Sequence, residues 1–100
     1  MPSKPPEPVN KYLYYCRVCG FENQNPPWGP KGKDPSRSIC PCCGSEFGYD
    51  DATEAGIKSA RERWFNDGCE WFVEGLKPMR WTPQKQIKNL EGSQWDFSGS

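Results

Sequence analysis

The sequence predicts a small α+β domain: a zinc ribbon with two cysteine knuckles on short β-hairpins, then one main helix and a short C-terminal helix. Two Cys-x-x-Cys-Gly motifs predict the knuckles, at Cys16–Gly20 and Cys40–Gly44. Aromatic, β-prone residues precede the first knuckle, and apolar residues with helical spacing follow the second. Since a bound metal stabilises such a domain, its core does not need to be large.

The four knuckle cysteines predict a metal site. Cys16, Cys19, Cys40 and Cys43 have the spacing C-x2-C-x20-C-x2-C, which is typical of four-thiolate zinc. Each turn directs two sulfurs toward one point, and the following Gly permits a positive φ. Disulfides would need an oxidising compartment, and residues 1–8 have no apolar segment typical of secretion. A catalytic redox dithiol usually occurs as a single Cys-x-x-Cys.

Two further cysteines are expected to remain free thiols. Cys42 lies inside the second knuckle, where its side chain should point away from the metal that Cys40 and Cys43 share. Cys69 stands alone and is expected to be a small buried apolar residue. The chain has no histidine, so a second metal at Cys42 and Cys69 would lack ligands.

Composition and charge limit the classes of function. The chain has nine Leu, Ile and Val residues but 14% aromatic residues, which indicates an aromatic core supported by a metal. The formal net charge is zero, and zinc held by four thiolates would make the protein mildly acidic. This argues against a general nucleic-acid binder. No apolar run approaches the roughly 18 residues of a membrane span, so we expect a soluble, cytoplasmic protein with no membrane partner.

The order of elements predicts one domain over residues 11–90, between a Pro-rich disordered tail, 1–10, and a C-terminal tail, 91–100. Residues 11–15 should form the strand that leads into the first knuckle. Acidic and capping residues at 50–54 begin a helix with an apolar stripe at Ile57, Ala60 and Trp64, and residues 66–68 end it. Apolar residues keep helical spacing across Gly68, so the sequence leaves open whether a helix continues or restarts there. Thr82-Pro83 begins a short helix through about Leu90.

Three residues are candidates for contact with a partner. Trp28 lies in a Pro/Gly-rich loop that should be at the surface, where an aromatic side chain is a typical binding hot spot. It could instead cover the metal and shield the sulfurs. Arg80 and Trp81 lie in a basic stretch with Lys77, Lys85 and Lys88. This stretch could bind phosphate or an acidic protein surface, but a solvated helix face is the favoured interpretation. For the paired aromatics at 64–65 and 71–72, packing is favoured over a stacking platform.

The run Ser38–Asp51, preceded by Tyr15–Gly20 and a Pro-Pro loop, resembles the small bacterial cysteine-rich CPCC-type proteins over about residues 12–72. The resemblance implies a metal at Cys16, Cys19, Cys40 and Cys43, and a fold, but no activity. One departure is that Cys-Pro-Cys-Cys lies in the second knuckle here. The knuckles also resemble those of rubredoxin, in which four thiolates hold a redox iron. The segment between them is shorter than in rubredoxins, and the C-terminal helices are foreign to that module.

These observations favour a protein-binding module that is stabilised by one structural Zn²⁺. An immunity or antitoxin-like role is an associational suggestion. The alternatives are an electron carrier with iron at the same cysteines and a nucleic-acid-binding regulator. An enzyme is least expected, because no histidine is available as a base and four thiolates leave no position for water on the metal.

Overall fold

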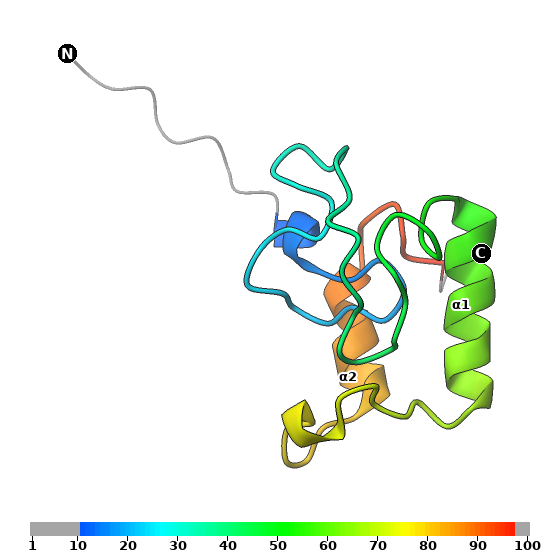
Figure 1. Ribbon diagram of the computed structural model, residues 1–100. Coiled ribbons are helices and arrows are strands. Elements are labelled where there is room, and N and C mark those ends of the chain that lie inside the picture. Colours follow the sequence, from blue (N-terminus) through cyan, green and yellow to red (C-terminus); the bar gives the residue numbers. More distant parts are fainter. Residues whose placement is uncertain (1–10, 98–100) are drawn as a thin grey trace.

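The computed structural model describes residues 11–97. The predicted tail 1–10 and the last three residues of the predicted tail 91–100 lie outside this range. The elements in chain order are η1 (Lys11–Tyr14), α1 (Glu54–Asn66), η2 (Glu74–Leu76), α2 (Pro83–Ile87) and η3 (Lys88–Leu90). The loops that carry the cysteines lie to one side of α1 and overlap α2 in the view, and the segment 67–80 connects the two helices along one edge (Figure 1).

The predicted β-hairpins are wrong: residues 11–97 contain no β-strand, so the chain is not a zinc ribbon on a sheet. Each knuckle is closed by a single isolated antiparallel bridge, Tyr15 with Glu22 and Ile39 with Glu46. Prolines at 26, 27, 30 and 35 lack the N–H that a longer ladder would need. The expected strand at 11–15 is instead the 3-10 helix η1, from which the Tyr12 hydroxyl donates to the Glu91 carbonyl oxygen at 2.8 Å.

The main helix is confirmed in place and extent. Thr53 caps α1, since its hydroxyl oxygen accepts from the Gly56 N–H at 2.9 Å. The stripe Ile57, Ala60 and Trp64 is buried as predicted. After Asn66 the chain passes through two positive φ angles, 91° at Gly68 and 56° at Cys69. The helix therefore does not restart across Gly68, and the next regular element is η2.

The C-terminal helix is also confirmed, in two short parts. Thr82 caps α2 by accepting from the Lys85 N–H at 3.3 Å, with Pro83 in the first turn. The 3-10 turn η3 then carries the chain to Leu90, which is 1% exposed. Beyond it, Trp95 is buried, so this part of the predicted tail packs back on the core.

The core is aromatic and sulfur-rich, as the shortage of aliphatic residues predicts. Trp81 connects two buried indoles, with ring centroids 6.1 Å from Trp64 and 5.3 Å from Trp71. Phe21, directly after the first knuckle, meets Trp71 edge-on at 5.6 Å. These contacts join α1, the 69–73 segment and the residues just before α2 to the cysteine loops. No helix within residues 11–97 is long and apolar enough to cross a membrane.

Candidate metal centre

The two knuckles have the same backbone geometry. In the first, the Cys16 N–H donates to the Phe21 carbonyl oxygen at 2.8 Å and the Gly20 N–H donates to that of Cys16 at 2.9 Å. In the second, Cys40 donates to Ser45 at 2.8 Å and Gly44 donates to Cys40 at 2.9 Å. Both glycines have the positive φ that their position predicts, 81° and 79°. The chain thus forms the same tight turn twice, and each turn presents two sulfurs.

The turns bring the four predicted ligands together. The Sγ atoms of Cys16, Cys19, Cys40 and Cys43 all lie within 4.8 Å of one another. Two Sγ–Sγ distances, Cys16 to Cys43 and Cys19 to Cys40, are 3.7 Å. A tetrahedron with sulfur about 2.3 Å from a central metal has edges of about 3.8 Å. The cluster therefore fits a tetrahedral metal, and these four cysteines could bind one.

The remaining cysteines lie outside this cluster, as predicted. The Cys42 Sγ accepts a hydrogen bond from Gln86 Nε2 at 3.2 Å. Cys69 is buried at the turn after α1, and burial raises the pKa of its thiol. All six cysteines are free, so no disulfide competes for the four clustered sulfurs.

Burial and sulfur contacts set the electrostatics of the cluster. Burial raises the pKa of the Cys16 and Cys19 thiols well above the ordinary value. Hydrogen bonds from Cys16, Cys19 and Cys40 instead lower the pKa of Cys43. Because metal ligation needs thiolates, a cation that binds here must displace the protons that burial favours on Cys16 and Cys19.

Three side chains from the helical half cap four consecutive carbonyls of the first knuckle. Arg61, on α1, donates through Nη2 to the Arg17 carbonyl oxygen and through Nε to that of Val18, both at 2.7 Å. Gln86, on α2, donates to the Cys19 carbonyl oxygen at 3.1 Å. Asn89, in η3, donates to that of Gly20 at 2.9 Å. The knuckle backbone is thereby held at every carbonyl from 17 to 20.

The second knuckle is held by backbone contacts. The Phe72 N–H donates to the Cys42 carbonyl oxygen at 2.9 Å, and the Val73 N–H donates to that of Pro41 at 2.8 Å. The segment after Cys69 thus runs along the Cys-Pro-Cys-Cys turn. Both halves of the cysteine cluster are therefore attached to residues beyond α1.

Trp28 is half-buried rather than exposed. Its ring stacks on the Arg17 guanidinium at 3.9 Å, and Trp95 lies at 4.6 Å from the same group. Its Nε1 donates to the Asp51 carboxylate at 2.8 Å. Burial lowers the pKa of Arg17, while the charge of Asp51 opposes that shift. The indole therefore covers the residue next to Cys16, and its contact with a partner stays a prediction.

The other two predicted partner residues lie elsewhere. Trp81 is half-buried in the aromatic core, with its Nε1 donating to Gln86 Oε1 at 2.8 Å. Arg80 is exposed and has a φ of 61°. Trp81 is thus connected to Cys19 through Gln86, whereas Trp28 contacts Arg17 and Asp51.

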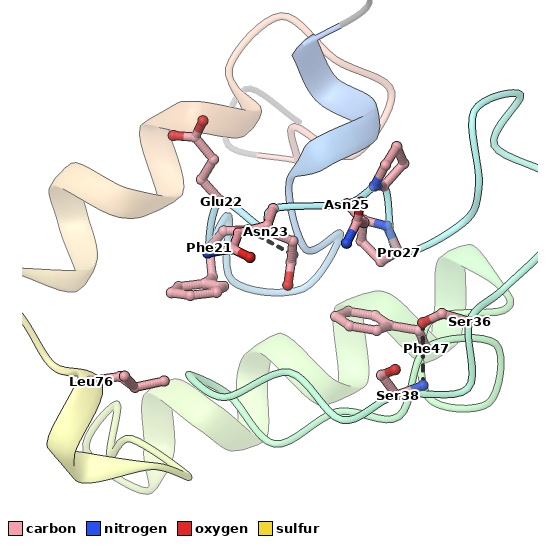
Figure 2. Close-up of a pocket in the computed structure, with 11 residues that line it drawn as sticks. Phe21, Glu22, Asn23, Asn25, Pro27, Ser36, Ser38, Phe47 and Leu76 are labelled. Atoms are coloured by element: carbon pink, nitrogen blue, oxygen red, sulfur yellow. Dashed lines mark hydrogen bonds between the residues drawn. The ribbon is translucent and has the colours of Figure 1, made fainter.

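A cavity of about 600 Å³ opens between the exits of the two knuckles. Figure 2 shows Phe21 and Phe47 on either side of it, with Leu76 at one end and Asn25 and Pro27 at the other. Most of the other lining residues are polar, including Asn23, Ser36 and Ser38. This cavity shares Phe21 and Glu22 with a smaller, more apolar groove beside Trp81.

Comparison with known proteins finds two uncharacterized relatives in Bacillus subtilis. YoaQ is 35% identical over 72 residues, which cover 55% of this chain and 59% of the relative. YozI is 31% identical over 74 residues, covering 58% of this chain and 61% of the relative. The chain thus spans about three fifths of the length of each. No family model and no solved structure matches.

These relatives and the cysteine cluster fit a small cysteine-rich group of proteins. The relatives carry no described activity, so the comparison assigns none here. The specific likeness to CPCC-type proteins stays a prediction.

Sequence reasoning found the four clustered cysteines but not Arg61, Gln86 or Asn89. In the sequence Arg61 is one of several charges on an exposed-looking helix, and the other two are neutral polar residues near a basic stretch. The only sequence signal for such donors was the presence of the knuckles themselves. A tight turn buries carbonyl groups that its own backbone does not pair, so donors had to come from elsewhere in the chain.

Proposed function

We propose that Cys16, Cys19, Cys40 and Cys43 bind one structural Zn²⁺ and that the domain it stabilises is a protein-binding module without catalytic activity. The observation that carries the metal proposal is the approach of the four Sγ atoms to within 4.8 Å of one another. Zinc binding at such a site has an apparent free energy on the order of 10 kcal/mol. This is comparable with the whole stability of a small domain.

The donor set supports a structural role. Four thiolates complete a tetrahedron and leave no position for a substrate or an activated water. Cys16, Cys19 and Cys40 are fully buried, and the capped carbonyls hold the first knuckle in one conformation. Six free cysteines also suit a reducing compartment, which supports the proposal of a cytoplasmic protein.

A protein-binding role is supported by what the fold leaves at its surface. In a chain with few aliphatic residues, Phe72, Leu76 and Met79 are 65%, 56% and 93% exposed. Exposed apolar side chains that gather into one patch mark interaction sites, and these three lie within eight residues of sequence. The zero net charge favours a protein over a nucleic acid as the partner.

Metal content and the visible spectrum of protein purified without added metal test the metal proposal. We expect one zinc per chain by inductively coupled plasma mass spectrometry and a colourless solution. A red protein with iron, whose visible bands bleach with dithionite, would replace this proposal with an electron carrier. Protein that folds with no metal at all would reject both.

A further inference from the structure

An apolar groove runs beside Trp81, on the face where α2 meets the segment after Cys69. It has a volume of about 320 Å³ and is lined in part by Phe21, Trp71, Pro78, Trp81, Lys85 and Asn89. Two of its aromatic rings, Trp71 and Trp81, pack edge-on with centroids 5.3 Å apart, and Phe21 meets Trp71 at 5.6 Å. These contacts fix the walls, so the groove is preformed. Its volume lies near the lower limit of ligand pockets, which suits one large side chain.

Positive charge surrounds this groove. Lys85 lines it, and Lys77 Nζ lies 5.7 Å from the centroid of the Trp81 ring. Arg80, between these two in sequence, is exposed. None of the three forms an ion pair with another residue of 11–97. Glu22 balances Lys85 on the lining, so the positive excess beside the groove comes from Lys77, near the Trp81 ring, and from Arg80, next to Trp81 in sequence.

One wall of the groove also holds an unsatisfied donor. Trp71 is 6% exposed, and its Nε1 has no hydrogen-bond partner among the described residues. A buried N–H without an acceptor costs about 1–3 kcal/mol. The Nε1 atom is itself buried, so it is the ring of Trp71 that contributes an apolar contact surface to the groove.

We propose that this groove binds an acidic segment of a partner protein, with one aromatic or large aliphatic side chain against Trp71, Trp81 and Pro78. Carboxylates next to that anchor would meet Lys77, Arg80 and Lys85. The inference rests on the proposed protein-binding function and names its surface and the chemistry of its partner. A nucleic acid is a poorer occupant, because three cations opposed by Glu22 neutralise few phosphates.

The experiment is a selection of 12-residue random peptides displayed on phage against the zinc-loaded full-length protein. We expect enriched peptides to carry a net negative charge and a conserved aromatic or aliphatic position. The best of them, made synthetically with a fluorescein label, should bind at least tenfold more weakly to Lys85→Glu, measured by fluorescence anisotropy. Glu22→Gln should bind two- to fivefold more tightly, since it removes the like charge from the lining.

Lys33→Glu is the matched control: it makes the same charge change at an exposed loop residue away from the groove and should leave affinity within twofold. Zinc content is measured for every variant, so loss of the metal site is distinguished from loss of the groove. If the selection yields neutral or basic peptides, or no enrichment, the inference is wrong. The same holds if Lys85→Glu and Lys33→Glu bind equally, or if a single-stranded oligonucleotide binds more tightly than the peptides.

Discussion

The Trp28 indole and the Asp51 carboxylate form a buried pair: Trp28 Nε1 donates to Asp51 Oδ2 at 2.8 Å, and Asp51 is 0% exposed. The other carboxylate oxygen accepts from the Gly48 N–H at 2.7 Å. This pair connects the Pro-rich loop to the turn that leaves the second knuckle. It therefore adds a contact between the loop that separates the knuckles and the exit of the second knuckle.

Trp28→Phe should lower the free energy of unfolding of the zinc-loaded protein by about 2 kcal/mol, because a buried carboxylate loses a donor while a ring remains against Arg17. Chemical denaturation measures the loss. A double-mutant cycle with Asp51→Ala, which removes the acceptor, should show a coupling of about 1 kcal/mol or more. Tyr49→Phe, at a ring that is 74% exposed, is the control and should change little. Additive effects of the two core substitutions would contradict the pairing.

Removal of the Arg61 side chain should destabilise the first knuckle. Arg61→Ala leaves the carbonyls of Arg17, Val18 and Trp95 without this donor, and we expect a loss of at least about 2 kcal/mol. Arg61→Lys should recover only part of it, because an ammonium cannot reproduce the guanidinium fork. Arg63→Ala, exposed on the same helix, should stay within about 0.5 kcal/mol. Equal losses of unfolding free energy in Arg61→Ala and Arg63→Ala would show that the three Arg61 hydrogen bonds contribute no specific stability.

Gly20 should not tolerate a side chain. A Cβ there would collide with the Gln86 carbonyl oxygen, and the φ of 81° is unfavourable for alanine. Gly20→Ala should therefore cost more than about 2 kcal/mol and weaken zinc retention against a chelator. Gly75→Ala, where a Cβ meets nothing within 4 Å, should be nearly neutral. A stable, zinc-retaining Gly20→Ala protein would mean that α2 does not approach the knuckle this closely.

The cysteine assignment predicts a clear division among single substitutions. Cys16→Ser and Cys43→Ser should abolish stoichiometric zinc and largely unfold the domain, as measured by metal analysis and circular dichroism. Cys42→Ser and Cys69→Ala should keep one zinc per chain, since neither sulfur belongs to the cluster. Loss of zinc from Cys42→Ser with retention in Cys43→Ser would reverse the assignment of the second knuckle.

The sequence was informative wherever a local rule decides the structure. Thr53 and Thr82 cap helices, Gly68 follows the end of α1, and both knuckle glycines have positive φ, because each depends on a few neighbouring residues. The prediction of β-hairpins was wrong because a strand depends on more than its neighbouring residues. Residues 11–15 have β-prone side chains, but a strand also needs a partner ladder, and the Pro-rich loop offers none.

Long-range contacts account for the rest of what could not be predicted. The exposure of Trp28 depends on Arg17, Asp51 and Trp95, which are brought together by the whole fold. The burial of Trp95 likewise depends on a loop far away in sequence. Pattern and spacing identify which cysteines can meet, but they do not indicate which side chains will pack around them.

The capped carbonyls of the first knuckle have a consequence for the order of events during synthesis. Residues 43 to 69 positions later in the chain supply the donors for carbonyls 17 to 20. A ribosome completes both knuckles well before it adds Gln86 and Asn89. In a growing chain the proposed metal site would therefore be synthesised before the side chains that cap carbonyls 19 and 20, and closure of the first knuckle would follow metal binding.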